Sequence, residues 1–162
     1  MAFADALRAL NDIKKDGVIE DYAIAGAMAV VFWTEPAPTF DLDVFVRLPG
    51  PATGLVRLDG IYRWAAARGY PAQDEHIVIE GLPTQLIPAP NPLTVEAIAA
   101  AAELDYEGVR IRVARPEYLI ALYLQPEART QKRRERAAML LALPTLNRAL
   151  ADEILERYGL SP

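Results

Sequence analysis

Apolar positions in the first 17 residues follow the spacing of an amphipathic helix. Phe3, Leu7, Leu10 and Ile13 recur at intervals of three or four, and Gly17 stands where such a helix would end. We therefore expect the chain to begin with a helix that turns one apolar face toward a core.

Residues 22–33 form a long apolar run that contains no charge. We expect a short strand at 22–25 and a buried helix from Gly26 to residue 33, ended by Pro36 and Pro38 in the loop that follows. Because a helix needs about 20 apolar residues to span a bilayer, this run is too short and predicts no membrane segment.

Two carboxylates interrupt the next apolar segment, residues 41–47. In a strand, Asp41, Asp43 and Phe45 share one face, and the apolar residues between them share the other. Carboxylates two residues apart are separated by about 7 Å along a strand and can converge on a hard cation such as magnesium. The segment predicts a divalent-metal site, with the alternative that both aspartates are simply exposed at a strand start and a sheet edge.

The remaining pattern alternates short strands with helices. We expect a helix at 55–68, strands at 76–80 and 84–87 joined by a turn at 81–83, an alanine-rich helix at 95–104, a hairpin-like pair at 105–108 and 109–113, and three helical pieces from 116 onward. This order indicates an α+β fold, a small mixed sheet flanked by helices with a helical C-terminal part. We expect residues 1–115 to form the core and 116–162 the C-terminal part of one compact unit.

Composition excludes several kinds of chemistry. The 162 residues include no cysteine, one histidine (His76) and one serine (Ser161), so thiolate metal sites, a histidine pair for zinc and a Ser-His-Asp hydrolase are all disfavoured. A hydrophobic fraction of 52% predicts a packed domain, which together with the missing cysteines is compatible with a cytoplasmic protein. The net charge of −5 disfavours non-specific binding to nucleic acid.

The order of these features resembles the DNA polymerase beta superfamily of nucleotidyltransferases. A short strand precedes Gly26 and Ala27 at the start of an apolar helix, and Thr39 leads into Asp41 and Asp43 after a proline-rich loop. In that superfamily a Gly-Gly or Gly-Ser pair lets the nucleotide phosphates approach the backbone at the helix N-terminus, and Ala27 is a mild departure. Thr39 either binds phosphate or caps the strand.

The C-terminal part is similar to AbiEii-like and minimal nucleotidyltransferase relatives. It carries GVRIRV at 108–113, PEYLIAL at 116–122 and then a basic helix. The resemblance covers roughly residues 20 to 143 and implies a nucleotidyltransferase-like small mixed sheet.

The resemblance implies a two-metal site in which Mg²⁺, held by Asp41 and Asp43, bridges a nucleoside triphosphate. A third carboxylate normally stands on a neighbouring strand, and Gln85 occupies that place here. Glutamine offers a carbonyl oxygen but no negative charge, so Glu80 is the alternative third ligand. Tyr123 is a further departure, because the relatives usually carry a lysine at this point.

The basic helix places Arg129, Lys132, Arg133 and Arg136 on one face by their spacing. Such a face would hold a triphosphate or an RNA backbone; the alternative is a solvated surface paired with nearby acids.

These features predict a nucleotidyltransferase-like protein that binds a nucleoside triphosphate with Mg²⁺. Transfer of a nucleotidyl group to a hydroxyl of RNA or protein, as in toxin-like relatives of toxin–antitoxin systems, is the implied reaction. The alternative is a catalytically degenerate module of the same fold that binds or regulates a partner. Apolar stretches at 139–143 and 146–155 predict a homodimer or a contact with a partner chain.

Overall fold

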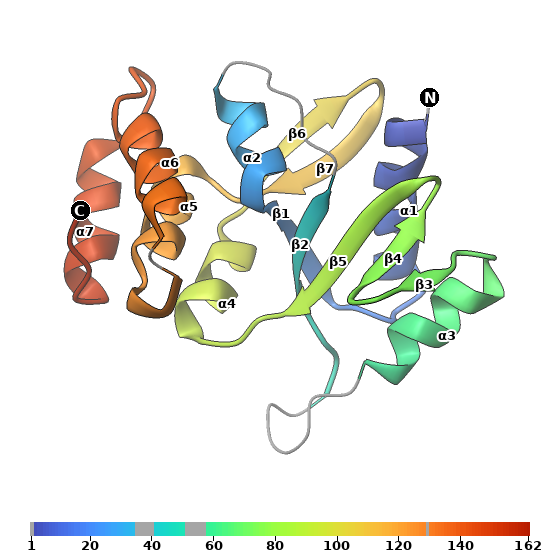
Figure 1. The fold of residues 1–162 in the computed structure, drawn as a ribbon. Helices are drawn as coiled ribbons and strands as arrows, with labels where there is room; N and C mark the ends of the chain where they lie inside the picture. Colours follow the sequence, from blue (N-terminus) through green and yellow to red (C-terminus); the bar gives the residue numbers. More distant parts are fainter. Residues whose placement is uncertain (1, 35–40, 51–57, 129) are drawn as a thin grey trace.

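The computed structural model describes residues 2–34, 41–50, 58–128 and 130–162 and is drawn in Figure 1. The strands are β1 (Asp21–Ala25), β2 (Leu42–Arg47), β3 (Ala72–Gln73), β4 (His76–Ile79), β5 (Leu82–Pro88), β6 (Ala102–Tyr106) and β7 (Val109–Val113). The helices are α1 (Ala2–Lys15), α2 (Gly26–Trp33), α3 (Asp59–Ala67), α4 (Pro92–Ala99), α5 (Pro116–Leu124), α6 (Gln131–Leu141) and α7 (Arg148–Arg157), with a 3₁₀ turn η1 at Pro126–Ala128. The predicted α+β class is confirmed.

The described strands form one mixed sheet in the order β3-β4-β5-β2-β1-β7-β6. At its centre β2 runs antiparallel to β1 and parallel to β5, and β1 runs parallel to β7. This register places two residues beside Asp43 of β2. Ala25 of β1 lies opposite it on one side, and Gln85 of β5 lies opposite it on the other.

The alternation predicted for residues 42–46 is confirmed by their burial, but the strand begins one residue later than predicted, so Asp41 precedes β2 and is exposed. Leu42, Val44 and Val46 have no exposed surface, whereas Asp43 and Phe45 are half-buried on the opposite face. Helix α4 packs on β1 and β2, and α1 packs on β5 and β7. Burial of one face of β2 in this way leaves the other face free to present polar side chains.

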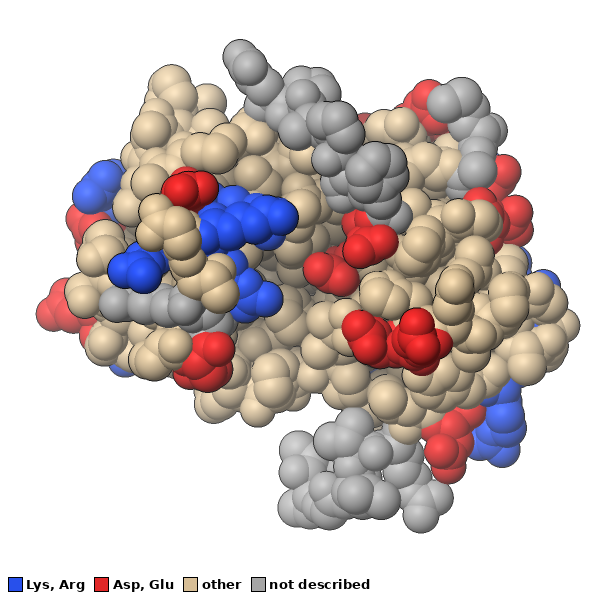
Figure 2. Space-filling model, viewed as in Figure 1, with Lys and Arg blue, Asp and Glu red and all other residues tan. Residues whose placement is uncertain are grey.

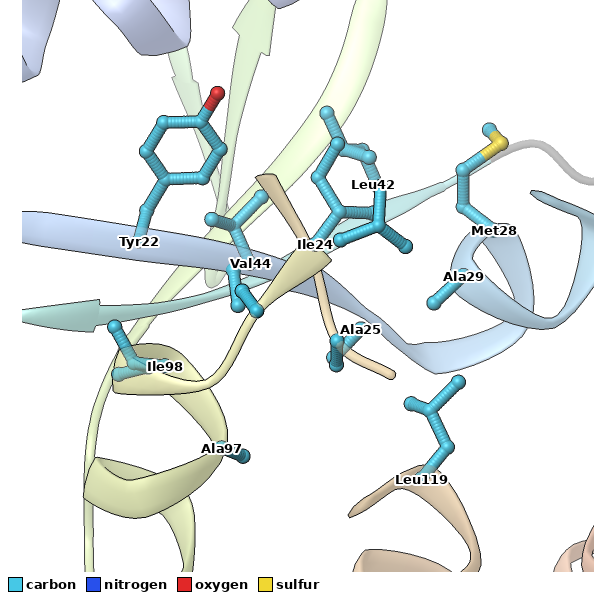
Figure 3. Packing of buried hydrophobic residues seen from close by; sticks show 14 of the residues in the cluster. Tyr22, Ile24, Ala25, Met28, Ala29, Leu42, Val44, Ala97, Ile98 and Leu119 are labelled. Carbon is cyan, nitrogen blue, oxygen red and sulfur yellow. The ribbon is translucent and has the colours of Figure 1, made fainter. Parts of the chain in front are cut away.

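The core joins the sheet to its surrounding helices. Figure 3 shows apolar side chains of β1, β2, α2, α4 and α5 converging on the middle of the molecule. Ile24, Leu119 and Ile98 are almost completely buried there. Each large aliphatic side chain removed from water in this way stabilises the fold by about 1.5–3 kcal/mol.

The alanine-rich helix expected at 95–104 is shorter than predicted. Helix α4 ends at Ala99, and residues 102–106 instead form β6, which pairs along its whole length with β7. High intrinsic helix propensity therefore yields to the hydrogen bonds of an antiparallel ladder, since propensity differences amount to only a fraction of a kcal/mol per residue.

The turn between β4 and β5 also differs from the prediction. Ile79 pairs with Leu82, so the turn consists of Glu80 and Gly81, and Pro83 lies within β5. Both turn residues have positive φ, 51° and 80°, which is the backbone of a tight two-residue hairpin. Strand β3, which follows α3, was not predicted at all, because its two residues are exposed and carry no apolar alternation.

Parts of the sequence prediction lie outside the described residues. These are the proline-containing loop at 35–38, most of the loop at 48–54 and the first residues of the helix expected at 55–68. The described part of that helix is α3. None of the helices in the described ranges has both the length and the apolar composition needed to cross a membrane.

Glu96 of α4 ties the C-terminal helices to the body of the fold. Its carboxylate accepts hydrogen bonds from the Tyr118 hydroxyl at 2.7 Å, from Nη1 of Arg157 at 2.7 Å and from the Tyr158 hydroxyl at 2.9 Å. These donors come from α5, the last residue of α7 and the residue after it. One carboxylate thus joins α4, α5 and α7, and α5 in turn packs against α6.

Candidate functional site

The half-buried face of β2 lies opposite the basic helix α6. Figure 2 shows acidic side chains gathered over the middle of the molecule and basic side chains over the C-terminal helices, with a hollow between them. Asp43 comes from β2, Gln85 from β5 and Arg133 from α6. Segments distant in the sequence therefore supply the two charged sides of this site.

Gly26 is packed directly against the Asp43 carboxylate. A Cβ atom added at Gly26 would stand 2.6 Å from Oδ2 of Asp43 and 3.1 Å from its Cβ. Gly26 also has a φ of +62°, a conformation that other residues rarely adopt. The chain passes here from β1 straight into α2, and Ala25 supplies no side-chain cap to the first turn of the helix. Gly26 is thus required both by the backbone and by the carboxylate beside it.

The pKa of Asp43 lies above its ordinary value. Burial is the main cause, and the negative charge of Asp41 adds to it, while His76, Arg133 and Arg136 act in the opposite direction. A half-buried carboxylate with a second negative charge nearby favours a bound cation, because a cation offsets both the burial of the charge and the repulsion.

A cavity of about 140 Å³ opens beside Asp43. It lies between the sheet, the start of α2 and helices α5 and α6. Its lining consists of Ala25, Gly26, Asp43, Phe45, Ile87, Leu119, Leu122, Tyr123, Gln125 and Arg133. The carboxylate of Asp43, the guanidinium of Arg133 and the phenol of Tyr123 therefore meet in a cavity with a largely apolar lining, where electrostatic interactions are stronger than in water.

Tyr123 is buried next to these charges. It is 6% exposed, and the proton of its hydroxyl has no acceptor in the described part of the chain. The guanidinium of Arg136 lies 5.9 Å from the centre of the Tyr123 ring and approaches the hydroxyl oxygen as a donor. Burial raises the pKa of the hydroxyl most, Arg136 and Arg133 lower it, and Asp43 raises it slightly.

Gln85 lies beside Asp43, and Glu80 does not. The parallel register of β2 and β5 pairs Asp43 with Gln85, which is half-buried on the same face. Glu80 is exposed in the hairpin turn five residues earlier, where it accepts a hydrogen bond from the Tyr70 hydroxyl at 3.0 Å. Five residues of strand span about 16 Å, so Gln85 is the residue placed to act as a third ligand.

His76 lies near Asp43, although the sequence alone does not mark it as a candidate site residue. Ile77 of β4 pairs with Thr84, which puts the preceding residue, His76, across from Gln85. Its charge lowers the pKa of Asp43. Only the strand order β4-β5-β2 reveals this proximity, because nothing in the local sequence marks His76.

The predicted basic face is only partly directed at the site. Arg133 lines the cavity, and Arg133 and Arg136 both act on Asp43. Lys132 is exposed on α6, and of the described residues that line the cavity only Arg133 comes from this helix. Ala27 is the second, half-buried residue of α2. Arg129 and Thr39 lie outside the described residues.

The donor set fits magnesium held jointly with phosphate. Asp41, Asp43 and the amide oxygen of Gln85 are hard oxygen donors, and Mg²⁺ in proteins often takes one or two carboxylates together with substrate phosphates. Within the described ranges, no group of three or more acidic or histidine side chains comes together as a self-sufficient metal site. Asp41, Asp43 and Gln85 are fewer donors than octahedral Mg²⁺ requires, so phosphate oxygens or water would supply the others.

Solved structures with the nucleotidyltransferase fold are similar to this chain. The antibiotic-resistance factor ANT(2″)-Ia, in complex with adenylyl-2″-tobramycin, has a TM-score of 0.57 and 14% identity over 98% of this chain and 99% of that chain. An antigenic nucleotidyltransferase-like protein from Paracoccidioides brasiliensis has a TM-score of 0.60 and 12% identity over 97% and 86% of the two chains. A Thermotoga maritima protein assigned to the nucleotidyltransferases has a TM-score of 0.51 and 15% identity over 86% and 90%.

These likenesses establish the nucleotidyltransferase fold that the sequence predicted. Neither a family model nor a curated protein sequence matches the chain.

Proposed function

We propose that this protein binds a nucleoside triphosphate with Mg²⁺ at Asp41 and Asp43 and transfers its nucleotidyl group to a hydroxyl. The observation that carries the proposal is the contact between Gly26 and Asp43, which sets a carboxylate directly beside the uncapped start of α2. A helix start offers backbone N–H groups to phosphate, and a carboxylate offers oxygen to the cation that accompanies it. The fold shared with solved nucleotidyltransferases supports the same function.

Each charged group has a separate part in the proposed reaction. Bound magnesium would neutralise phosphate charge and hold the triphosphate against Asp41 and Asp43. Arg133 and Arg136 approach from α6 and balance negative charge on the other side. The acceptor hydroxyl gives its proton to a carboxylate of the site, and its oxygen bonds to the α-phosphorus. The bond from this phosphorus to the oxygen that bridges it to the β-phosphorus breaks, and pyrophosphate leaves.

The acceptor we propose is a hydroxyl of RNA or protein, in a toxin–antitoxin setting. The resemblance of residues 108–113 and 116–122 to segments of AbiEii-like relatives motivates this choice. ANT(2″)-Ia is bound to adenylyl-2″-tobramycin, so a small-molecule hydroxyl belongs in the same acceptor panel. Radiolabelled nucleoside triphosphates incubated with RNA, protein and aminoglycoside acceptors would separate these classes.

The first test is a calorimetric titration of ATP and GTP with and without magnesium. We expect metal-dependent binding in the unaltered protein and a loss of about 100-fold or more in affinity in the Asp41→Asn/Asp43→Asn double variant. The reason is that the variant lacks the two charges that hold the cation, and an interaction with a charged group is worth about 1.5–3 kcal/mol for each group removed.

The matched control is Asp105→Asn/Asp152→Asn, which removes the same two charges from exposed positions. Asp105 pairs with Arg110 and Asp152 with Arg148, and the aspartates are 65% and 62% exposed. Such surface pairs contribute about 0–1 kcal/mol, so affinity and stability should change little. Equal binding by the protein and the Asp41/Asp43 variant would refute the proposed site.

A second candidate function is a catalytically degenerate module that binds nucleotide without transferring it. Gln85 favours this candidate, because it occupies the position opposite Asp43 and cannot accept a proton as a carboxylate does. We expect Gln85→Asp to raise transferase activity by about 100-fold, the lower end of the roughly 10²–10⁴-fold that a positioned general base contributes. Initial rates of pyrophosphate release would measure it. Loss of metal-dependent binding in Gln85→Asp would argue against a ligand role at this position.

A further inference from the structure

The hydroxyl of Tyr123 is a buried polar group whose proton has no acceptor in the described part of the chain. The residue is 6% exposed, and Arg136 approaches the hydroxyl oxygen only as a donor. Buried hydroxyls are almost always paired, because an unpaired one loses its interaction with water and gains nothing in return. An exception of this kind calls for a specific explanation.

Tyr118, one helical turn and one residue earlier in α5, has the opposite arrangement. It is 5% exposed, yet its hydroxyl donates a 2.7 Å hydrogen bond to Glu96. Two tyrosines of one helix are therefore equally buried, but only the hydroxyl of Tyr118 donates a hydrogen bond to another residue. A comparison of the two isolates the effect of the missing acceptor at Tyr123.

The surroundings of Tyr123 identify the missing partner as an anion. Tyr123 lines the cavity together with Asp43, Gly26 and Arg133, and Arg136 lies over its ring. Two guanidinium groups and the uncapped start of α2 favour negative charge, while Asp43 requires a cation between itself and that charge.

The volume of the cavity limits what it can enclose. About 140 Å³ is well below the roughly 300–1,000 Å³ of pockets that enclose drug-sized ligands. A complete nucleotide therefore does not fit inside it, but a phosphate group does. The base and sugar would lie outside, over the more open face of the sheet.

We propose that the Tyr123 hydroxyl donates a hydrogen bond to a phosphate oxygen of the bound polyphosphate chain. Tyr123 is then a substrate-binding residue whose buried hydroxyl is completed by the ligand. This inference rests on the proposed function, because it assumes that a polyphosphate binds with magnesium beside Asp43.

The test compares Tyr123→Phe with Tyr118→Phe, using magnesium with inorganic tripolyphosphate or with ATP as probes. Tyr123→Phe keeps the ring and removes only the oxygen, so packing of the core is preserved. We expect the Kd for tripolyphosphate to rise by about 10- to 100-fold, the usual effect of losing a hydrogen bond to a charged acceptor. Without ligand, its Tm should rise by roughly 2–6 °C, because an unsatisfied buried group has been removed.

Tyr118→Phe should behave in the reverse way. Its ligand-free Tm should fall, because Glu96 loses a donor, and its Kd for tripolyphosphate should stay within about twofold of the unaltered protein.

Each other result has a distinct meaning. An unchanged Kd in Tyr123→Phe, or a fall in its ligand-free Tm, would overturn the role of the hydroxyl and leave the proposed function standing. Binding of magnesium ATP without any binding of tripolyphosphate would also overturn it, because the cavity would not hold the phosphate chain. Failure of the unaltered protein to bind either probe would overturn both the inference and the proposed function.

Discussion

Replacing Gly26 by alanine is expected to destabilise the protein by about 2–5 kcal/mol and to abolish binding of magnesium nucleotide. A φ of +62° costs an alanine about 1–2 kcal/mol. Its methyl group would stand 2.6 Å from Oδ2 of Asp43, and relieving such an overlap typically costs a further 1–3 kcal/mol or so. Urea unfolding and calorimetric titration with magnesium ATP would measure the two effects.

Gly17→Ala is the matched control for this substitution. Gly17 has a similar φ of +78°, but a Cβ added there meets no atom within 4 Å. Gly17→Ala should therefore lower the free energy of unfolding only by the cost of a positive φ, about 1–2 kcal/mol, and the variant should keep its affinity for nucleotide. If Gly26→Ala bound nucleotide as tightly as Gly17→Ala, the carboxylate beside Gly26 would not be part of the binding site.

Replacing Glu96 by alanine is expected to lower the free energy of unfolding by about 2–4 kcal/mol. The substitution removes an acceptor shared by Tyr118, Arg157 and Tyr158. Because Tyr118 is 5% exposed, its hydroxyl would be left buried without a partner, which by itself costs about 1–3 kcal/mol. Urea unfolding at neutral pH would measure the loss, and Glu153→Ala on the exposed side of α7 should change stability by less than about 0.5 kcal/mol.

The effect of Glu96 should also depend on pH. Burial raises the pKa of this carboxyl, but hydrogen bonds from Tyr118 and Tyr158 and the charge of Arg157 outweigh it, so the pKa lies below the ordinary 4.5. The ionised group therefore stabilises the folded state fully above about pH 4.5, and this contribution is lost as the pH falls through the lower folded value. The stability difference between the unaltered protein and Glu96→Ala should be constant near neutrality and shrink in acid. A difference that grew in acid would contradict this account.

Much of the centre of the fold was predictable, because local pattern and burial agree there. The apolar run before and after Gly26, and the alternation around Asp41 and Asp43, predicted β1, α2 and β2 with the correct faces. Strong periodicity determines which side of an element is buried, and this holds wherever the rest of the chain supplies a core.

Other features were not predictable from local pattern. The alanines at 100–102 favour helix, yet β6 forms because β7 offers a complete antiparallel partner. The charge of His76 reaches Asp43 only because two intervening pairings, β4 with β5 and β5 with β2, bring it there. The pairing of β5 with β2 joins residues far apart in the chain, and a single sequence carries no direct record of it.

The sequence by itself determined the class of fold, the place of Asp43 on the partly exposed face of a strand and the glycine that precedes it. These depend on periods of two and 3.6 residues and on backbone freedom, which are properties of short segments. The tertiary structure decided that Gly26 touches Asp43, that Gln85 rather than Glu80 stands beside it, and that the Tyr123 hydroxyl has no acceptor for its proton among the described residues. Contacts of this kind depend on strand order and helix packing, because only packing brings distant side chains together and excludes the water that would otherwise satisfy them.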